Sequence, residues 1–420
     1  MGLSIRDVLL ADGRTGSVTV EGNRIAEIGP KRDADVTIDG RGKALLPGFV
    51  NTHTHAAMTL LRGYADDMDL RSWLSEKIWP AEAKLSPEAI YWGTKLACLE
   101  MIRSGTTCFN DMYFHMDQAA KAVDEMGLRA VLGEGFLDLS DPARAEAEFR
   151  KARDVVGRIN GMHNPRIVPA VAPHAIYTVS EKSLLDLGRW AEEAGCVFHI
   201  HLAETRAEVD TAKKEHGKSP VAFLESLGLL RPNVVAAHCV WLEDPDVRAL
   251  ANRGVQVAHC PVSNMKLAVG RAMPLAALQS AGVGVALGTD GPASNNSLDM
   301  FDTMKVAALL HKHATSEPTA ARAADVLDMA TLGGARALRL DAGVVREGKL
   351  ADLILVDLKR PGFTPSHNLV SNLVYAATGD CVDTVICDGR VIMRDRRVAG
   401  EVEILEKAGE FAARLAGARS

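Results

Sequence analysis

The middle of the chain alternates between amphipathic helical stretches and short apolar runs. Residues 87–105 repeat apolar positions at helical spacing, and residues 105–112 follow as a largely apolar run of strand length. The same succession recurs at 181–202 and at 273–290. This rhythm extends from residue 48 to residue 344. It predicts an α/β fold in which a parallel sheet closes into a (β/α)8 barrel.

Both ends of the chain carry a different pattern. Residues 1–47 alternate apolar and polar positions between short turns, which predicts antiparallel strands. Residues 345–420 return to short strands and close with a helical stretch at about 402–418. We expect the two terminal segments to pair into one small composite β-sandwich beside the barrel. The chain then divides into the stretches 1–47, 48–344 and 345–420.

Side chains that can bind a metal or carry a proton stand where several apolar runs end. The candidates are His53, His55, His201, Glu204, His238 and Asp290. The run 44–50 is expected to form a buried strand before the first two, whose i, i+2 spacing places both imidazoles on one face. In a (β/α)8 barrel all such strand ends meet at the C-terminal rim, where active sites are built.

The His-x-His spacing alone carries little weight. A chain with 13 histidines among 420 residues contains roughly 0.4 such pairs by chance. Two more pairs occur here, His199/His201 and His311/His313. We expect His199 to be a core residue, and the second pair lies in a helical stretch where positions i and i+2 diverge. The stronger signal is the succession of candidate residues at strand ends.

Composition narrows the class of protein. With 47% hydrophobic residues, the chain can bury a core larger than that of one ordinary domain. A net charge of −6 argues against a nucleic-acid surface, and no apolar stretch reaches the length that spans a membrane. The N-terminal segment lacks a signal-peptide pattern, and the seven cysteines form no Cys-x-x-Cys pair. We therefore expect a cytoplasmic protein with reduced thiols.

Four segments carry a resemblance to a known family. They read HTHAAMTLLRG, HLAET, AAHCV and LGTDGPASNNSLDMF, and they resemble the adenosine-type aminohydrolase branch of the amidohydrolase superfamily. Within it the chain is similar to the 5′-methylthioadenosine/S-adenosylhomocysteine deaminases and the archaeal-type 5′-deoxyadenosine deaminases, including an insert at 64–85. The resemblance implies a distorted (β/α)8 TIM barrel, a composite β-sandwich and one divalent metal ion per subunit, with zinc favoured.

The resemblance also implies roles for residues. The metal ligands are His53, His55, His201 and Asp290, and the catalytic residues are Glu204, His238 and Asp290. Three imidazoles and one carboxylate leave zinc a position for water, which ionises near neutral pH when bound. Asp290 and His238 can orient this water and take its proton. Glu204 can protonate N1 of a purine and then serve the departing amine. The implied reaction converts an adenosine-type nucleoside into its inosine analogue and ammonia.

Further residues are expected to contact the substrate, together with Glu204 and Asp290. Binuclear relatives bridge two metals with a lysine at the end of the fourth strand, where this chain has His174. One metal is therefore expected, and the resemblance leaves His174 to bind substrate. The insert supplies Trp73 and Glu82, whose carboxylate can accept a hydrogen bond from each ribose hydroxyl.

The group at the 5′ carbon of the nucleoside is expected to depend on Glu134. Relatives that act on S-adenosylhomocysteine carry an arginine at this position, and a carboxylate there should repel the substrate's own carboxylate. Arg144 is expected to compensate in part for the arginine that is missing at position 134. The sequence thus favours 5′-deoxyadenosine, methylthioadenosine or adenosine over S-adenosylhomocysteine.

Other functions stay open at this point. An aminohydrolase acting on guanine, cytosine or a triazine would use the same metal set. An amide- or ring-hydrolysing enzyme is less favoured without the bridging lysine, and a non-catalytic barrel is disfavoured because all the candidate metal and proton-transfer positions are chemically intact. The expected partner is a small purine nucleoside, with neither nucleic acid nor membrane, and we expect a homo-oligomer, either a dimer or a tetramer.

Overall fold

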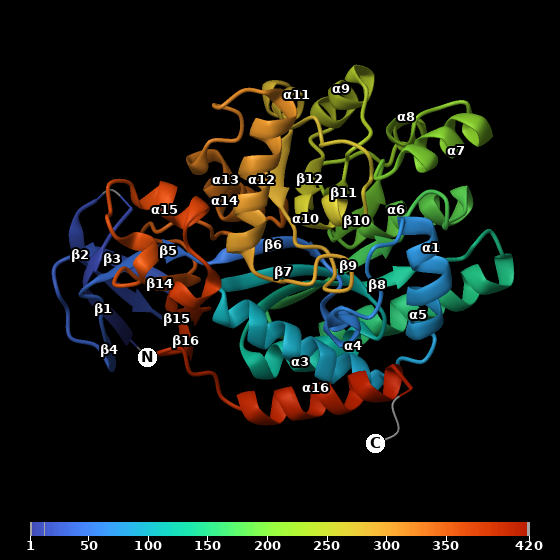
Figure 1. Cartoon of the computed structure of the whole chain (residues 1–420). Helices are drawn as coiled ribbons and strands as arrows, with labels where there is room; N and C mark the ends of the chain where they lie inside the picture. The colour runs from blue at the N-terminus through green and yellow to red at the C-terminus, as the bar shows by residue number, and fades with distance from the viewer. Residues whose placement is uncertain (1, 12, 418–420) are drawn as a thin grey trace.

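The computed structural model describes residues 2–11 and 13–417, which form two eight-stranded sheets (Figure 1). One sheet is parallel and runs in chain order: β6 (Phe49–Thr54), β7 (Thr106–Tyr113), β8 (Arg129–Phe136), β9 (Ile167–Pro173), β10 (Val197–Leu202), β11 (Val234–His238), β12 (Gln256–His259) and β13 (Gly284–Leu287). The last strand returns to the first, where the Thr52 hydroxyl donates to the Leu287 carbonyl at 2.8 Å. The predicted barrel is confirmed.

Helices follow the barrel strands, as the alternating pattern predicts. They are α3 (Pro87–Arg103), α4 (Met116–Met126), α5 (Pro142–Gly161), α6 (Glu181–Glu193), α7 (Arg206–His216), α8 (Pro220–Ser226), α9 (Asp244–Asn252), α10 (Pro261–Lys266), α11 (Leu275–Ser280), α12 (Met300–Thr315), α13 (Ala323–Ala330) and α14 (Leu332–Ala337). Their starts have local causes: the Ser180 side chain accepts from the amide of Ser183 and caps α6. Helix α7 ends at Gly217, whose φ of +67° suits glycine.

Strands from both ends of the chain join in the second sheet. It contains β1 (Gly2–Leu9), β2 (Thr15–Glu21), β3 (Arg24–Gly29), β4 (Val36–Asp39), β5 (Lys43–Pro47), β14 (Leu353–Asp357), β15 (Val382–Cys387) and β16 (Arg390–Met393). The two halves meet where β5 pairs antiparallel with β14. The sheet is mixed rather than purely antiparallel, because β4 and β5 both run parallel to β1. A register shift between Ile5 and Val8 divides β1 into two parts with different neighbours.

The run 44–50 is not one strand, contrary to the expectation from its apolar character. Its first part lies in β5 of the terminal sheet and its last part in β6 of the barrel. Gly48 lies between them, and a Cβ there would come within 2.2 Å of the Thr107 hydroxyl oxygen. Only glycine therefore lets the chain pass closely from one sheet to the other.

The remaining segments cover the barrel. The insert forms α1 (Leu70–Ser72), η2 (Trp73–Ile78) and α2 (Trp79–Glu82) after η1 (Ala56–Leu61), and the C-terminal part adds η3 (Pro361–Phe363), α15 (Leu369–Tyr375), η4 (Gly379–Cys381) and α16 (Glu401–Leu415). Helix α16 lies along α3 (Figure 1). Position 418 of the helix expected at 402–418 lies outside the described residues. Among the helices of residues 2–11 and 13–417, none has the length and apolar character needed to cross a membrane.

A buried ion pair joins the barrel to the terminal sheet. The guanidinium of Arg129, at the start of β8, contacts Asp352 at 3.0 Å and Asp388 at 2.9 Å. Removing one partner of such a group leaves uncompensated buried charge. We expect Arg129→Met to lower the free energy of unfolding by about 3–5 kcal/mol, measured by urea denaturation.

An exposed ion pair provides the control for Arg129. Arg322 pairs with Asp325 at 2.9 Å on the surface, and exposed pairs of this kind contribute little to stability. Arg322→Met should therefore change the free energy of unfolding far less than Arg129→Met. Equal effects of the two substitutions would show that the buried pair does not hold the two sheets together.

Candidate active site

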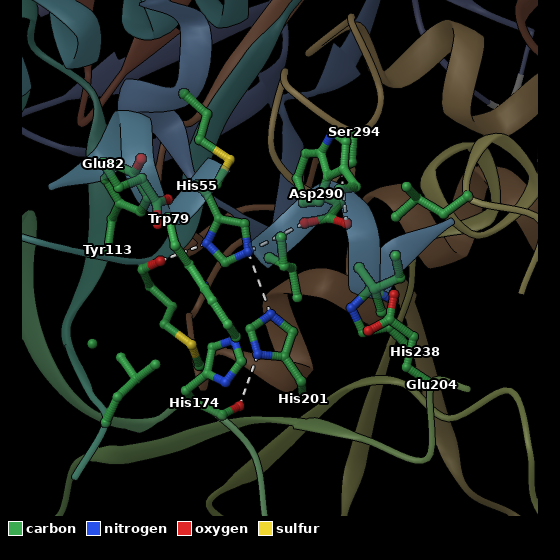
Figure 2. A pocket seen from close by; sticks show the side chains of 18 of the residues that line it. His55, Trp79, Glu82, Tyr113, His174, His201, Glu204, His238, Asp290 and Ser294 are labelled. Atoms are coloured by element: carbon green, nitrogen blue, oxygen red, sulfur yellow. Dashed lines mark hydrogen bonds and ion pairs between the residues drawn. The ribbon is translucent and has the colours of Figure 1, made fainter. Parts of the chain in front are cut away.

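A cavity of about 680 Å³ opens among the C-terminal ends of the barrel strands. Figure 2 shows its side chains: His55, His201 and Asp290 point toward one another, Glu82 and Tyr113 stand on one side, and Glu204 and His238 on the other. These residues come from β6, β7, β10, β11, the turn after β13 and the insert. The strand ends therefore converge as the sequence pattern predicts.

The four side chains expected to bind a metal lie together. The Oδ1 atom of Asp290 is 3.3 Å from Nε2 of His53 and 3.3 Å from Nε2 of His55. Nε2 of His201 lies 3.3 Å from Nε2 of His55. All four side chains are at least largely buried, and Nε2 of His53 has no hydrogen-bond partner among the described residues.

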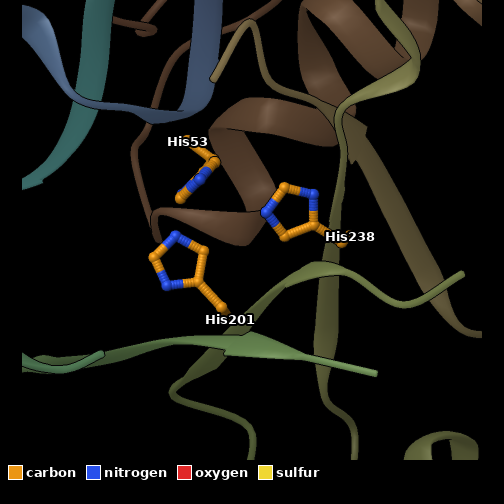
Figure 3. A group of neighbouring side chains, drawn as sticks. All are labelled: His53, His201 and His238. Atoms are coloured by element: carbon orange, nitrogen blue, oxygen red, sulfur yellow. The ribbon is translucent and has the colours of Figure 1, made fainter. Parts of the chain in front are cut away.

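These separations fit a divalent cation. A tetrahedral zinc ion with ligands at about 2.0–2.1 Å requires ligand atoms roughly 3.3–3.4 Å apart. The Nε2 atoms of His55 and His201 face each other at this distance, so a positive charge between them would be favourable. Figure 3 shows that His238 also points to the same centre, with His53 and His201, and the ligand atoms of these three lie within 4.8 Å of one another. His238 thus lies next to the expected ligands, although it was not itself expected to bind the metal.

The electrostatics of the group favour a cation. Burial disfavours charge on His55, but Asp290 outweighs it and raises the pKa of His55 to about 9. In turn, and despite its burial, the two histidines hold the pKa of Asp290 well below its usual range. Burial lowers the pKa of His53, and burial together with the neighbouring imidazoles lowers that of His201. His53, His201 and Asp290 are thus held in the neutral or ionised forms that bind metals, and a metal ion would take the place of the proton on His55.

Other contacts fix the orientation of Asp290. Its Oδ2 accepts from the hydroxyl of Ser263 at 2.5 Å and from that of Ser294 at 3.1 Å. Its Oδ1 accepts from the backbone amide of Gly291 at 2.7 Å and faces the histidines. One carboxylate oxygen of Asp290 therefore contacts the two serine hydroxyls, and the other faces the histidines.

Glu204 and His238 form the proton-transfer side of the cavity. Nδ1 of His238 lies 3.7 Å from Oε1 of Glu204 and 2.9 Å from the side-chain nitrogen (Nδ2) of Asn264. Burial and then the nearby carboxylates of Asp290 and Glu208 raise the pKa of Glu204 well above its usual value. Burial lowers the pKa of His238 to about 3. Burial thus favours the neutral forms of both the Glu204 carboxyl group and the His238 imidazole.

The backbone is strained at the ends of three strands. Ala203, His238 and Asp290 have φ values of 51°, 73° and 61°, in the left-handed region that these residue types rarely adopt. Such conformations cost about 1–3 kcal/mol each and cluster at functional sites. Glu208 supports one of them, since its carboxylate accepts from the amides of Ala203 and Glu204, both at 2.8 Å.

The other residues expected to contact substrate also line the cavity. Trp73, Glu82 and His174 all reach the cavity. Burial raises the pKa of Glu82 to about 7, while the Tyr113 hydroxyl opposes this shift. Burial lowers the pKa of His174 to about 3, and its Nδ1 contacts the Thr178 hydroxyl at 2.8 Å. The wall combines one titratable carboxyl group with aromatic surface.

The expectation for Glu134 is wrong. Its side chain is 1% exposed, forms an ion pair with Lys151 at 2.8 Å and accepts from the amides of His115 and Met116 at the start of α4. The next residue, Gly135, faces the cavity instead, because successive side chains of a strand point to opposite sides. Glu134 therefore caps a helix and cannot repel a substrate. Arg144 is exposed and donates to the Leu137 carbonyl at 2.7 Å beside the cavity.

Several site residues escaped the sequence analysis. Tyr113, Trp79, Ser263, Asn264 and Glu208 were not singled out. Tyr113 ends β7 and Ser263 and Asn264 follow β12, so the strand-end rule applied elsewhere could have found them. Glu208 completes a Thr-x-x-Glu pattern at the start of α7, which is a readable helix-start signal. Trp79 has no comparable signal.

Comparison with known proteins decides the family. The model of the amidohydrolase family matches residues 44–392. The chain belongs to the amidohydrolase family. It is 51% identical over 405 residues to the 5′-deoxyadenosine deaminase of Methanothermobacter thermautotrophicus, covering 96% of this chain and 94% of that protein. It is also 50% identical over 406 residues, 96% of each chain, to the 5-methylthioadenosine/S-adenosylhomocysteine deaminase 1 of Archaeoglobus fulgidus.

The amidohydrolase likeness extends to a solved structure. An adenosine deaminase from Xanthomonas campestris, crystallised with bound zinc, superimposes with a TM-score of 0.93 at 37% identity and covers 98% of both chains. The family resemblance predicted from HTHAAMTLLRG and the other segments is thereby confirmed, as is the barrel fold. In this amidohydrolase, none of the described residues that line the cavity is a lysine.

Proposed function

We propose that the protein hydrolyses the C6–N bond of adenosine-type nucleosides and releases the inosine analogue and ammonia. The observation that carries this proposal is the cavity itself. It brings a metal-type cluster, the buried carboxyl group of Glu204 and the carboxyl group of Glu82, a possible acceptor for ribose hydroxyls, into one space. The relatives named as deaminases of 5′-deoxyadenosine, 5-methylthioadenosine and adenosine support the same reaction.

One divalent ion, with zinc favoured, fits the group His53, His55, His201 and Asp290. When bound, it would lower the pKa of water so that hydroxide is available near neutral pH. The chain supplies the fixed positions: three Nε2 atoms and one carboxylate oxygen on rigid strand ends. The zinc in the similar adenosine deaminase structure supports this identity of the ion.

Residues of the chain then accept and donate the protons of the reaction. His238 is uncharged because its pKa is about 3, so with Asp290 it can accept the proton of the attacking water. Burial raises the pKa of Glu204 and so favours its protonated form, from which it can donate to N1 as the C6 carbon becomes tetrahedral. The proton gained at the water site returns to the amino group, the C6–N bond breaks and ammonia leaves. The second proton of the water, still on the C6 oxygen, is lost as the inosine-type carbonyl forms and restores the Glu204 carboxyl group.

The cavity wall near the insert suits an uncharged 5′ group. Leu70, Trp73, Leu74, Phe114, Leu137 and Tyr177 line it, and no arginine or lysine is among the described lining residues. This replaces Glu134 as the reason to expect poor use of S-adenosylhomocysteine, whose carboxylate would lack a cationic partner inside. Arg144 lies next to Leu137 and is the candidate that could offset this loss.

A panel of nucleosides tests the proposed function. We expect ammonia release with kcat/KM higher for 5′-deoxyadenosine and methylthioadenosine than for S-adenosylhomocysteine, and poor use of free adenine. Glu82→Gln should lower kcat/KM for 5′-deoxyadenosine about 10–100-fold, because hydrogen bonds to a charged group contribute about 1.5–3 kcal/mol. The value for 2′,5′-dideoxyadenosine should change less. Since the pKa of Glu82 is about 7, discrimination between these two should increase as the pH rises through 7.

Glu76→Gln, on the exposed side of η2, is the matched control and should leave all these values unchanged. Absence of ammonia release from every adenosine analogue, with release from guanine or cytosine, would replace the proposed substrate class by one of the other heterocycles. Arg144→Ala should lower kcat/KM for S-adenosylhomocysteine and leave kcat/KM for the other nucleosides unchanged.

The state of the cysteines supports a proposal for the cellular compartment of the protein. All seven cysteines are free, and six of them are buried. Reduced, buried thiols are typical of cytoplasmic proteins. We propose a cytoplasmic homo-oligomer, whose size can be measured by light scattering.

A further inference from the structure

The three histidines of the proposed metal site are held through their second nitrogen. Nδ1 of His55 lies 2.5 Å from the Met112 carbonyl oxygen, and Nδ1 of His201 lies 2.8 Å from the His174 carbonyl oxygen. Nδ1 of His53 has a different partner, Nε2 of His199, at 2.8 Å. Two of the three histidines are thus fixed by backbone and the third by a side chain.

The difference has a chemical consequence. A carbonyl oxygen can only accept, so His55 and His201 must carry their proton on Nδ1, which leaves Nε2 free to bind a metal. His199 can either donate or accept through Nε2. His53 can bind a metal through Nε2 only when its own proton is on Nδ1, and that proton then needs an acceptor.

We propose that His199 is a positioning residue for the metal site: it accepts the hydrogen bond from Nδ1 of His53 and thereby directs Nε2 of His53 to the ion. The two rings meet edge to face, with centroids 4.9 Å apart and an interplanar angle of 88°. This inference rests on the proposed metal site and adds to it a residue outside the ligand set.

Packing alone does not explain a histidine here. Both side chains are fully buried, and His199 is not among the residues that line the cavity. Nδ1 of His199 has no hydrogen-bond partner among the described residues, and such an unsatisfied buried atom costs stability. An apolar residue would fill this strand position without that cost. The contact with His53 is therefore the interaction that accounts for the imidazole.

A second buried pair of histidines supplies a matched control. Nε2 of His311 on α12 lies 3.0 Å from Nε2 of His259 at the end of β12. Neither residue belongs to a group of side chains that could hold a metal. His311→Met therefore removes the same kind of buried contact without touching the metal site.

The experiment compares His199→Met, His199→Gln and His311→Met in the full-length chain. The zinc dissociation constant is measured by chelator competition, and the melting temperature of each metal-free protein is measured alongside. His199→Met should raise the dissociation constant 10–100-fold, the range typical of lost orienting contacts. His199→Gln, of nearly the same size but with an accepting oxygen, should stay within about threefold of wild type. The zinc dissociation constant of His311→Met should also stay within about threefold of wild type, even if this substitution lowers the melting temperature.

The outcomes separate this inference from the proposed function. The proposed metal site is overturned if the wild-type protein does not bind one zinc ion per chain. It is also overturned if the His53→Ala variant binds zinc as tightly as the wild-type protein does. Tight zinc binding by wild type with no change in His199→Met overturns only the role of His199. Equal weakening by the Gln and Met variants, or by His311→Met, also overturns it. If His199→Met does not fold, His199→Leu takes its place, and failure of both to fold without metal assigns His199 to the core.

Discussion

Asp290→Asn is expected to weaken zinc binding and to lower kcat/KM for 5′-deoxyadenosine by at least about 10³-fold, since a bound ion contributes several kcal/mol to transition-state stabilisation. The Oδ1 atom of the Asp290 carboxylate lies 3.3 Å from Nε2 of both His53 and His55. It also brings the negative charge that offsets the cation. Zinc content by elemental analysis and ammonia release measure the two effects.

Asp111→Asn is the matched control for this loss. Asp111 is also a buried carboxylate at a strand end, and burial raises its pKa to about 7. It belongs to neither group of possible ligands, and its Oδ1 accepts from the Ala56 amide at 3.1 Å, a contact that asparagine preserves. The variant should keep its zinc.

Metal removal completes the test. Dialysis of wild type against a chelator should abolish ammonia release, and one zinc per chain should restore it. Two ions per active chain, or full activity of Asp290→Asn, would contradict the proposed mononuclear site.

Glu204→Gln is expected to keep the zinc and to lower kcat by about 10²–10⁴-fold, the range for a positioned acid–base group. Glutamine preserves the shape of the side chain but cannot carry a proton to N1 or to the departing amine. His238→Asn should also keep the ion and slow turnover. Loss of zinc from either variant would instead place that residue among the ligands, which is a sharp question for His238 because its ring faces the same centre (Figure 3).

Glu208→Gln provides the comparison for Glu204. Glu208 is a second buried carboxyl group only four residues away, and burial raises its pKa to about 7. It does not line the cavity and serves the amides of Ala203 and Glu204. We expect this variant to be less stable in urea but to retain kcat within about tenfold, since it makes no proton transfer. A loss equal to that of Glu204→Gln would indicate that backbone geometry, not proton transfer, explains both.

The strand-end residues could be predicted because their signal is local. His201, His238 and Asp290 each follow an apolar run, and the boundary between a buried strand and a turn is visible in the order of residues. Ser263 and Asn264 obey the same rule but follow β12, which has only four residues, Gln256–His259. So short a strand gives a weak pattern.

The error at Glu134 has a different cause. Every residue of β8 is buried, on the side that faces the barrel interior and on the side that faces the helices. A strand buried on both faces shows no alternation of polar and apolar positions, so its phase is not readable. Whether Glu134 or Gly135 faced the cavity was therefore decided by the closed barrel alone.

The sequence by itself determined the class of fold, the family and the residue types that reach the active-site rim, because periodicity, turn residues and the order of motifs are properties of neighbours along the chain. Only the tertiary structure decided which nitrogen of each histidine faces the centre, the separations of 3.3 Å, and the partnership of His53 with His199 across 146 positions. It also decided the shifted pKa values of Glu204 and His238, since these follow from burial by segments remote in sequence. Ligand geometry and solvation depend on distances in space, which no local pattern encodes.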